Sequence, residues 1–124
     1  MTTTEGDIHV QRLVPPAGIP SATSLRLWAK AARGRRRGEL TIRIVAADEG
    51  RTLNRDWRGR DYATNVLSFP FDEPGYLGDI VICAEVVTRE AIEQHKAARA
   101  HWAHMVVHGV LPVSYTHLTL PTKA

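Results

Sequence analysis

Short alternating or apolar stretches mark the strands of this chain, because a period of two places every second side chain on one face. The clearest stretch is LTIRIVA, in which Leu40, Ile42 and Ile44 share a face. The predicted strands are residues 8–13, 40–46, 65–69 and 79–83. Pro15, which follows the first of them, ends that strand.

A different spacing marks the first helix. Apolar residues recur at positions i, i+3, i+4 and i+7 between Leu25 and Ala32, which predicts one apolar face of an amphipathic helix. Ser21 is the predicted N-cap, and Gly34 with the arginines after it is expected to end the helix.

Three further helices complete the predicted order of elements. Asp48 is the predicted cap of a short helix that ends near Gly59, and residues 84–99 form the next helix. Residues 101–111 form the last one, after a small break. The order β α β α β β α α predicts an α+β fold, with a small mixed sheet of about four strands and helices packed on it.

Length and composition indicate one globular domain, since 124 residues with 44% hydrophobic content can bury a single core. No stretch approaches the roughly 20 apolar residues of a membrane span. The N-terminus lacks the basic and apolar regions of a signal peptide. Cys83 is the only cysteine, which excludes an internal disulfide. We therefore expect a cytoplasmic protein.

Arginines are clustered, although the net charge is only +3. The clusters are Arg33, Arg35, Arg36 and Arg37, and then Arg51, Arg55, Arg58 and Arg60. A guanidinium is planar and permanently charged, so it suits phosphate recognition. For the run at 33–37 we favour a solvated surface without a ligand.

The tryptophans offer a second way to bind nucleic acid, because bases stack on exposed aromatic rings. Trp28, Trp57 and Trp102 each lie on a predicted helix beside apolar residues. Core packing is therefore the interpretation we favour for all three.

Histidines are concentrated on the last predicted helix. His104 and His108 stand at i and i+4, so both rings project from one side, and His101 extends the same stripe. The spacing is that of the metalloprotease motif H-E-x-x-H, but Met105 occupies the position of the catalytic glutamate, which argues against a protease. The histidines are then either metal ligands or polar groups packed at the edge of the core.

Three blocks in the chain, in order, resemble one known family. They are LNRDWRGRDYATNVLSFPF (residues 53–71), LGDIVIC (residues 77–83) and HWAHMVVHGVL (residues 101–111). They are similar to L-N-x-x-[YW]-R-x-x-D-x-x-T-[ND]-V-L-S-F-P, to L-G-D-I-x-I and to the opening of H-G-x-L-H-L-x-G-Y-D-H. These are motifs of the YbeY family of metal-dependent endoribonucleases, and the resemblance extends from about residue 8 to residue 111.

The resemblance implies a single-strand-specific endoribonuclease that acts in ribosomal RNA 3′-end maturation and ribosome quality control. Ribosomal RNA and the small ribosomal subunit are the partners it implies. It also implies one Zn²⁺ held by three histidines near the C-terminus, with open positions where bound water becomes a nucleophile. His108 matches the first metal ligand. Arg58 matches an arginine implicated in activity, with a role in holding the RNA phosphate or the charge that develops on it.

The chain departs from the motif after His108. The second ligand position holds Pro112, and the third holds Leu118, with His117 one residue out of place. Proline offers no donor atom to a metal and disfavours helix at Leu111, so we expect the helix to end there. With one of three ligands retained, the chain as given is expected to bind metal weakly and to cleave little RNA.

We interpret residues 1–111 as an incomplete YbeY-like domain and residues 112–124 as a non-native tail, foreign from about Val113. The letters VSYTHLTLPT resemble a translated sequencing-library adapter and have no relation to the helix before them. A divergent member that has lost its metal is the other explanation. A different functional class also stays open: a non-catalytic RNA- or ribosome-binding accessory factor that uses the arginine clusters.

Overall fold

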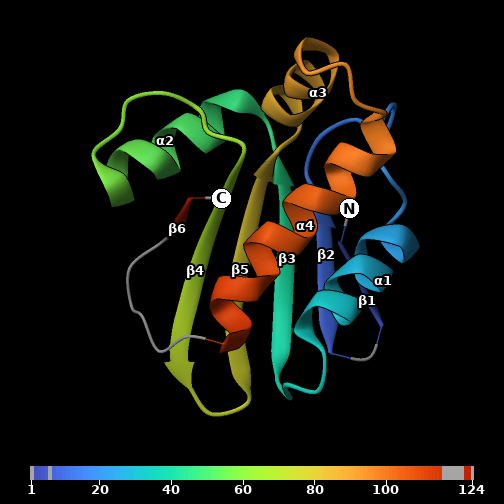
Figure 1. The fold of residues 1–124 in the computed structure, drawn as a ribbon. Coiled ribbons are helices and arrows are strands. Elements are labelled where there is room, and N and C mark those ends of the chain that lie inside the picture. The colour runs from blue at the N-terminus through green and yellow to red at the C-terminus, as the bar shows by residue number, and fades with distance from the viewer. Residues whose placement is uncertain (1, 6, 116–121, 124) are drawn as a thin grey trace.

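Six strands form one mixed sheet in the described part of the chain, in the order β1-β2-β3-β5-β4-β6 (Figure 1). The computed structural model describes residues 2–5, 7–115 and 122–123. The strands are β1 (Thr2–Glu5), β2 (Ile8–Arg12), β3 (Glu39–Val45), β4 (Val66–Glu73), β5 (Tyr76–Cys83) and β6 (Thr122–Lys123). Strand β3 is parallel to β2 and β5, whereas β4 is antiparallel to β5, and β1 to β2.

The predicted α+β fold with a mixed sheet is confirmed, and each predicted strand is present. Two edge strands, β1 and β6, were not predicted. The sequence of β1, TTTE, contains no apolar residue and so gives no alternation to detect. Strand β6 lies in the segment interpreted as a tail.

Helices cover both faces of the sheet. They are α1 (Ala22–Arg33), α2 (Ala47–Arg58), α3 (Ala84–Glu93) and α4 (Ala98–Tyr115). Helices α1 and α4 pack against each other across one face, and α2 packs on the opposite face (Figure 1). Within residues 2–5, 7–115 and 122–123, no helix combines the length and apolar character needed to cross a bilayer.

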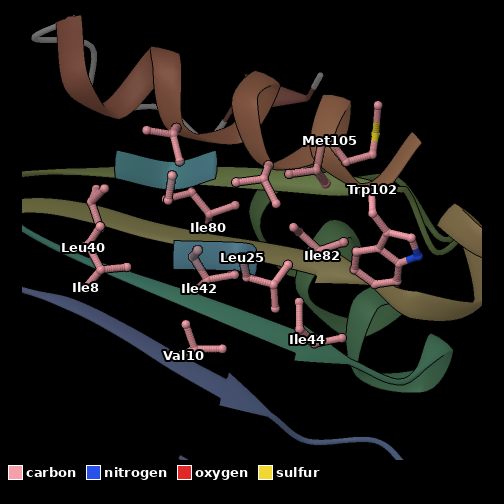
Figure 2. Packing of buried hydrophobic residues seen from close by; sticks show 14 of the residues in the cluster. Ile8, Val10, Leu25, Leu40, Ile42, Ile44, Ile80, Ile82, Trp102 and Met105 are labelled. Carbon is pink, nitrogen blue, oxygen red and sulfur yellow. The ribbon is translucent and has the colours of Figure 1, made fainter. Parts of the chain in front are cut away.

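The main core lies between the sheet and helices α1 and α4 (Figure 2). Leu25 of α1 and Trp102 of α4 are buried against isoleucines of the two central strands. Those isoleucines are Ile42, Ile44, Ile80 and Ile82. Burial of each such side chain contributes roughly 1.5–3 kcal/mol, so this face holds α4 in place. On the opposite face Val45, Leu67 and Val81 form a smaller cluster under α2.

Helix α4 approaches the sheet at a glycine. A Cβ atom at Gly109 would lie 2.5 Å from Ile80 Cγ2 and 2.9 Å from Val66 Cγ2. The Gly109 carbonyl also accepts a hydrogen bond from the Ser68 hydroxyl at 2.7 Å. Because successive residues turn by about 100° around a helix, the residue before this glycine, His108, is directed away from the sheet.

The start of α1 is as predicted, and the start of α2 is not. The Ser21 hydroxyl accepts a hydrogen bond from the Ser24 N–H at 3.2 Å, and Gly34 is the C-cap. Helix α2 has Ala46 as its N-cap and no side-chain cap, so the prediction that Asp48 is the cap was wrong. Asp48 lies instead within the first turn, where its carboxylate is stabilised by the positive end of the helix dipole.

The helix predicted over residues 84–99 is divided in two. Helix α3 ends at Glu93, and α4 begins at Ala98. Between them His95 has a φ of 55°, in the left-handed region that a continuing helix cannot adopt. The break is therefore wider and earlier than the sequence indicated.

The prediction that the last helix ends near Leu111 was wrong, because α4 continues through Pro112 to Tyr115. Val113 and Ser114 are buried, and Val113 belongs to the main core. Pro112 cannot donate a hydrogen bond to the His108 carbonyl, a loss that costs about 3 kcal/mol in a helix interior. Burial of the next turn offsets part of that cost.

Candidate functional site

His108 and His104 form an exposed pair on the outer side of α4. Their Nε2 atoms lie 2.7 Å apart, and the rings meet edge to face with centroids 4.1 Å apart. In a hydrogen bond between two imidazoles one ring donates and the other accepts, so the contact requires an unprotonated acceptor. Desolvation, and then the charges of His108, Lys96 and His101, lower the pKa of His104. The lowered pKa favours the neutral form of His104, the form in which an imidazole binds metal.

His101 does not join this pair. Its side chain is buried, and its Nε2 lies 3.0 Å from Glu90 Oε1 of α3. The Asn65 side-chain amide donates to the same carboxylate at 3.2 Å. Of the two interpretations of the histidine stripe, His101 fits the packed polar group, which links α3, α4 and the segment before β4.

The remaining metal-ligand positions do not complete a site. Pro112 lies within α4 and has no donor atom, while His117 and Leu118 lie outside the described residues. Among the residues that are described, His, Cys, Asp and Glu nowhere form a group of three that could hold an ion. The donor chemistry of the exposed imidazoles fits zinc, but their number does not fit a three-histidine site.

Arg58 is the last residue of α2, and Gly59 follows it in the left-handed conformation. The guanidinium is partly buried, and its Nη1 has no hydrogen-bond partner. A salt bridge with Asp56 or Asp61 would give Arg58 a purely structural role. Those carboxylates are instead bound by other arginines, Arg55 at 3.2 Å and Arg51 at 2.7 Å.

The structure does not place Arg58 and His108 on one face. Helix α2, which carries Arg58, packs over the smaller cluster, and α4 packs over the main core on the other side of the sheet. The order of the elements gave no information on this separation, because it does not show on which face of the sheet each helix packs.

Asp79 belongs to a hydrogen-bond network on the α2 face. The Tyr76 hydroxyl donates to the Asp79 carboxylate and lies 2.6 Å from the Thr41 hydroxyl. Burial, and then the hydrogen bond to Asp79, raise the pKa of Tyr76 to about 12. Since Ile80 faces α4, Asp79 points to the other side of β5, away from the helix that carries His108.

One aromatic residue was assigned to the wrong environment. Trp102 is buried and Trp28 packs against the main core, as predicted. Trp57 was predicted to be in the core but is 62% exposed, with its ring edge to face with Phe69. A sequence signal was available: Trp57 is flanked by charged residues on both sides, which is unusual for a core position.

Comparison with known proteins gives a consistent result. A family model described as "Endoribonuclease YbeY" matches residues 21–121. An endoribonuclease YbeY of Stenotrophomonas maltophilia strain R551-3 is 54% identical over 116 residues, covering 85% of this chain and 72% of the relative. That of Stutzerimonas stutzeri strain A1501 is 54% identical over 108 residues, covering 80% and 68%.

A solved structure agrees. The solution structure of TM1509 from Thermotoga maritima superimposes with a TM-score of 0.57 at 25% identity, covering 88% of this chain and 75% of that one. The matched relatives are nucleases, hydrolases that cut within an RNA strand. The chain belongs to the YbeY endoribonuclease family.

Proposed function

We propose that this chain is built as a single-strand-specific, metal-dependent endoribonuclease of the cytoplasm, acting in ribosomal RNA 3′-end maturation and ribosome quality control. Its partners would be ribosomal RNA and the small ribosomal subunit. The observation that carries the proposal is the close packing of Gly109 against Ile80. In this arrangement His108, which matches the first ligand position of the family motif, is exposed. The family match over residues 21–121 supports the same reaction class.

Zinc is the metal we propose for the intact family site, with His108 as one ligand. A bound Zn²⁺ would lower the pKa of a coordinated water and supply the nucleophile for phosphodiester hydrolysis. On the outer side of α4 the described residues supply two exposed imidazoles, those of His104 and His108, one fewer than a three-histidine site needs. We therefore expect weak zinc binding and little RNA cleavage from the chain as given.

Arg58 is the residue we propose for phosphate binding. Its guanidinium is partly buried, and the nearby Asp56 and Asp61 are bound by other arginines. A guanidinium donates charge-assisted hydrogen bonds to phosphate oxygens, and Arg58 matches the arginine of the family motif that is implicated in activity. The same residue would serve an accessory factor that binds RNA without cutting it.

The deciding experiment replaces residues 112–118 with the family sequence H-L-x-G-Y-D-H. Elemental analysis should give about one zinc per chain for this restored variant and much less for the chain as given. The restored variant should cleave single-stranded RNA, and His108→Ala in it should abolish both zinc and cleavage. If the restored variant holds zinc but leaves RNA intact, while Arg58→Ala weakens RNA binding, the accessory factor is the correct function.

The foreign-tail interpretation of residues 112–124 needs its own test. Independent genomic DNA sequenced across the codon for Leu111 should diverge from the given sequence after that point. If the same tail is recovered, the divergent-member explanation is correct.

A further inference from the structure

The α2 face of the sheet carries an aromatic groove that the proposed metal chemistry does not use. Its walls include Trp57 of α2 and Phe69 and Phe71 of β4, with Arg43 and Asp79 from the neighbouring strands. Its volume is about 340 Å³, within the roughly 300–1,000 Å³ typical of small-molecule pockets. The groove is therefore large enough for a planar ring.

The aromatic side chains of this groove are exposed but held in place. Trp57 is 62% exposed and meets Phe69 edge to face, with ring centroids 5.9 Å apart. Phe71 is 46% exposed and stacks on Tyr76, with centroids 5.2 Å apart. Rings fixed by their neighbours lose little conformational entropy when a ligand stacks on them.

The charged side chains around the groove favour a nucleobase over a phosphate group as the ligand. Arg43 is bound to Glu49 at 2.6 Å, and the Asp79 carboxylate lines the groove. A carboxylate repels phosphate but accepts a hydrogen bond from the amino group of a base. The Asp79 carboxylate and the paired Arg43 therefore favour a base over a phosphate within the groove.

We propose that the aromatic groove binds a base of single-stranded RNA, stacked on the exposed ring of Trp57 or of Phe71. The choice of RNA as the ligand rests on the proposed function. Stacking on an aromatic side chain requires an unpaired base, so the groove selects single strands over duplexes.

Fluorescence anisotropy with a labelled single-stranded RNA of about 12 nucleotides tests this site. EDTA in the buffer removes any contribution from cleavage. Trp57→Ala and Phe71→Ala should each weaken binding by roughly fivefold or more. Trp57→Phe keeps an aromatic ring and should retain affinity to within about twofold.

Leu27 provides the matched control. It is also 62% exposed but lies on α1, on the opposite face of the sheet. Leu27→Ala should leave RNA affinity unchanged, and circular dichroism should show that all variants are folded. A duplex of the same sequence should bind more weakly than the single strand and should not distinguish Trp57→Ala from the parent.

Three results would overturn the proposal: unchanged affinity in both alanine variants, an equal loss with duplex RNA, or an equal loss in Leu27→Ala. If the parent chain sediments as a dimer and the Trp57→Ala variant sediments as a monomer, a second copy of the chain, and not RNA, occupies the groove. The nuclease function fails separately, through zinc content and cleavage in the restored variant, which do not depend on this binding measurement.

Discussion

At the scale of single residues, Gly109 links the packing of the molecule to its candidate chemistry. The glycine allows α4 to approach the methyl groups of Ile80 and Val66, and the same helical turn directs His108 outward. The pairing of histidine and glycine in the sequence thus has a steric reason that is independent of any metal.

Gly109→Ala should therefore destabilise the fold. Its Cβ would lie 2.5 Å from Ile80 Cγ2, so the helix or the strand must shift, at a cost of about 1–3 kcal/mol. Gly50 of α2 is the control, because a Cβ there meets its nearest neighbour at 3.4 Å. Gly50→Ala should be neutral or stabilise by up to about 1 kcal/mol through helix propensity. Urea unfolding measures both, and equal effects would contradict the steric argument.

Tyr76 predicts a pH dependence at the alkaline end. Its pKa is about 12 in the folded chain against 10.0 for the free side chain. The folded chain therefore favours the neutral phenol. The contribution of this group to the free energy of unfolding is fully present below pH 10 and is lost as the pH rises through about 12. Spectrophotometric titration should show one late phenolate transition, which Tyr76→Phe removes and Asp79→Asn shifts toward 10. A chain in which every tyrosine titrates near 10 would contradict this assignment.

At the scale of elements, α4 contains an internal proline, so removal of that proline should stabilise the helix. Pro112→Ala restores an N–H that can bond to the His108 carbonyl and should raise the free energy of unfolding by up to about 3 kcal/mol. Pro74→Ala, in the exposed turn between β4 and β5, is the control and should give no comparable gain. If α4 ended at Leu111, Pro112→Ala would have no effect.

The elements also show what the sequence could and could not predict. Strand β3 was found because its alternate residues enter one core. The packing of helix α2 was not predictable in this way, because the residues it buries are Gly50 and Asn54, and neither is a large hydrophobic residue. Trp57 was consequently assigned to the core. The extension of α4 was missed for a different reason. The sequence shows that Pro112 disfavours a helix, but it does not show that strands distant in the sequence bury Val113.

At the scale of the whole molecule, the sheet separates two candidate functions. The histidine pair lies on the α4 side, and the aromatic groove lies on the α2 side. The candidate site residues Arg58 and His108 were each named from the family motif, but their placement on opposite faces depends on how α2 and α4 pack on the sheet. A strand of RNA held at both positions must pass around an edge of the sheet.

This separation predicts different kinetic effects in the restored variant that carries the family motif at residues 112–118. Trp57→Ala removes binding that is equal in the ground and transition states, so it should raise KM roughly fivefold or more and leave kcat nearly unchanged. His108→Ala removes the proposed metal ligand and should reduce cleavage to background, a larger loss than the roughly 10–100-fold typical of outer-shell changes. Steady-state cleavage of single-stranded RNA measures both constants. If Trp57→Ala lowers kcat as His108→Ala does, the groove takes part in the reaction itself, and the two faces do not act separately.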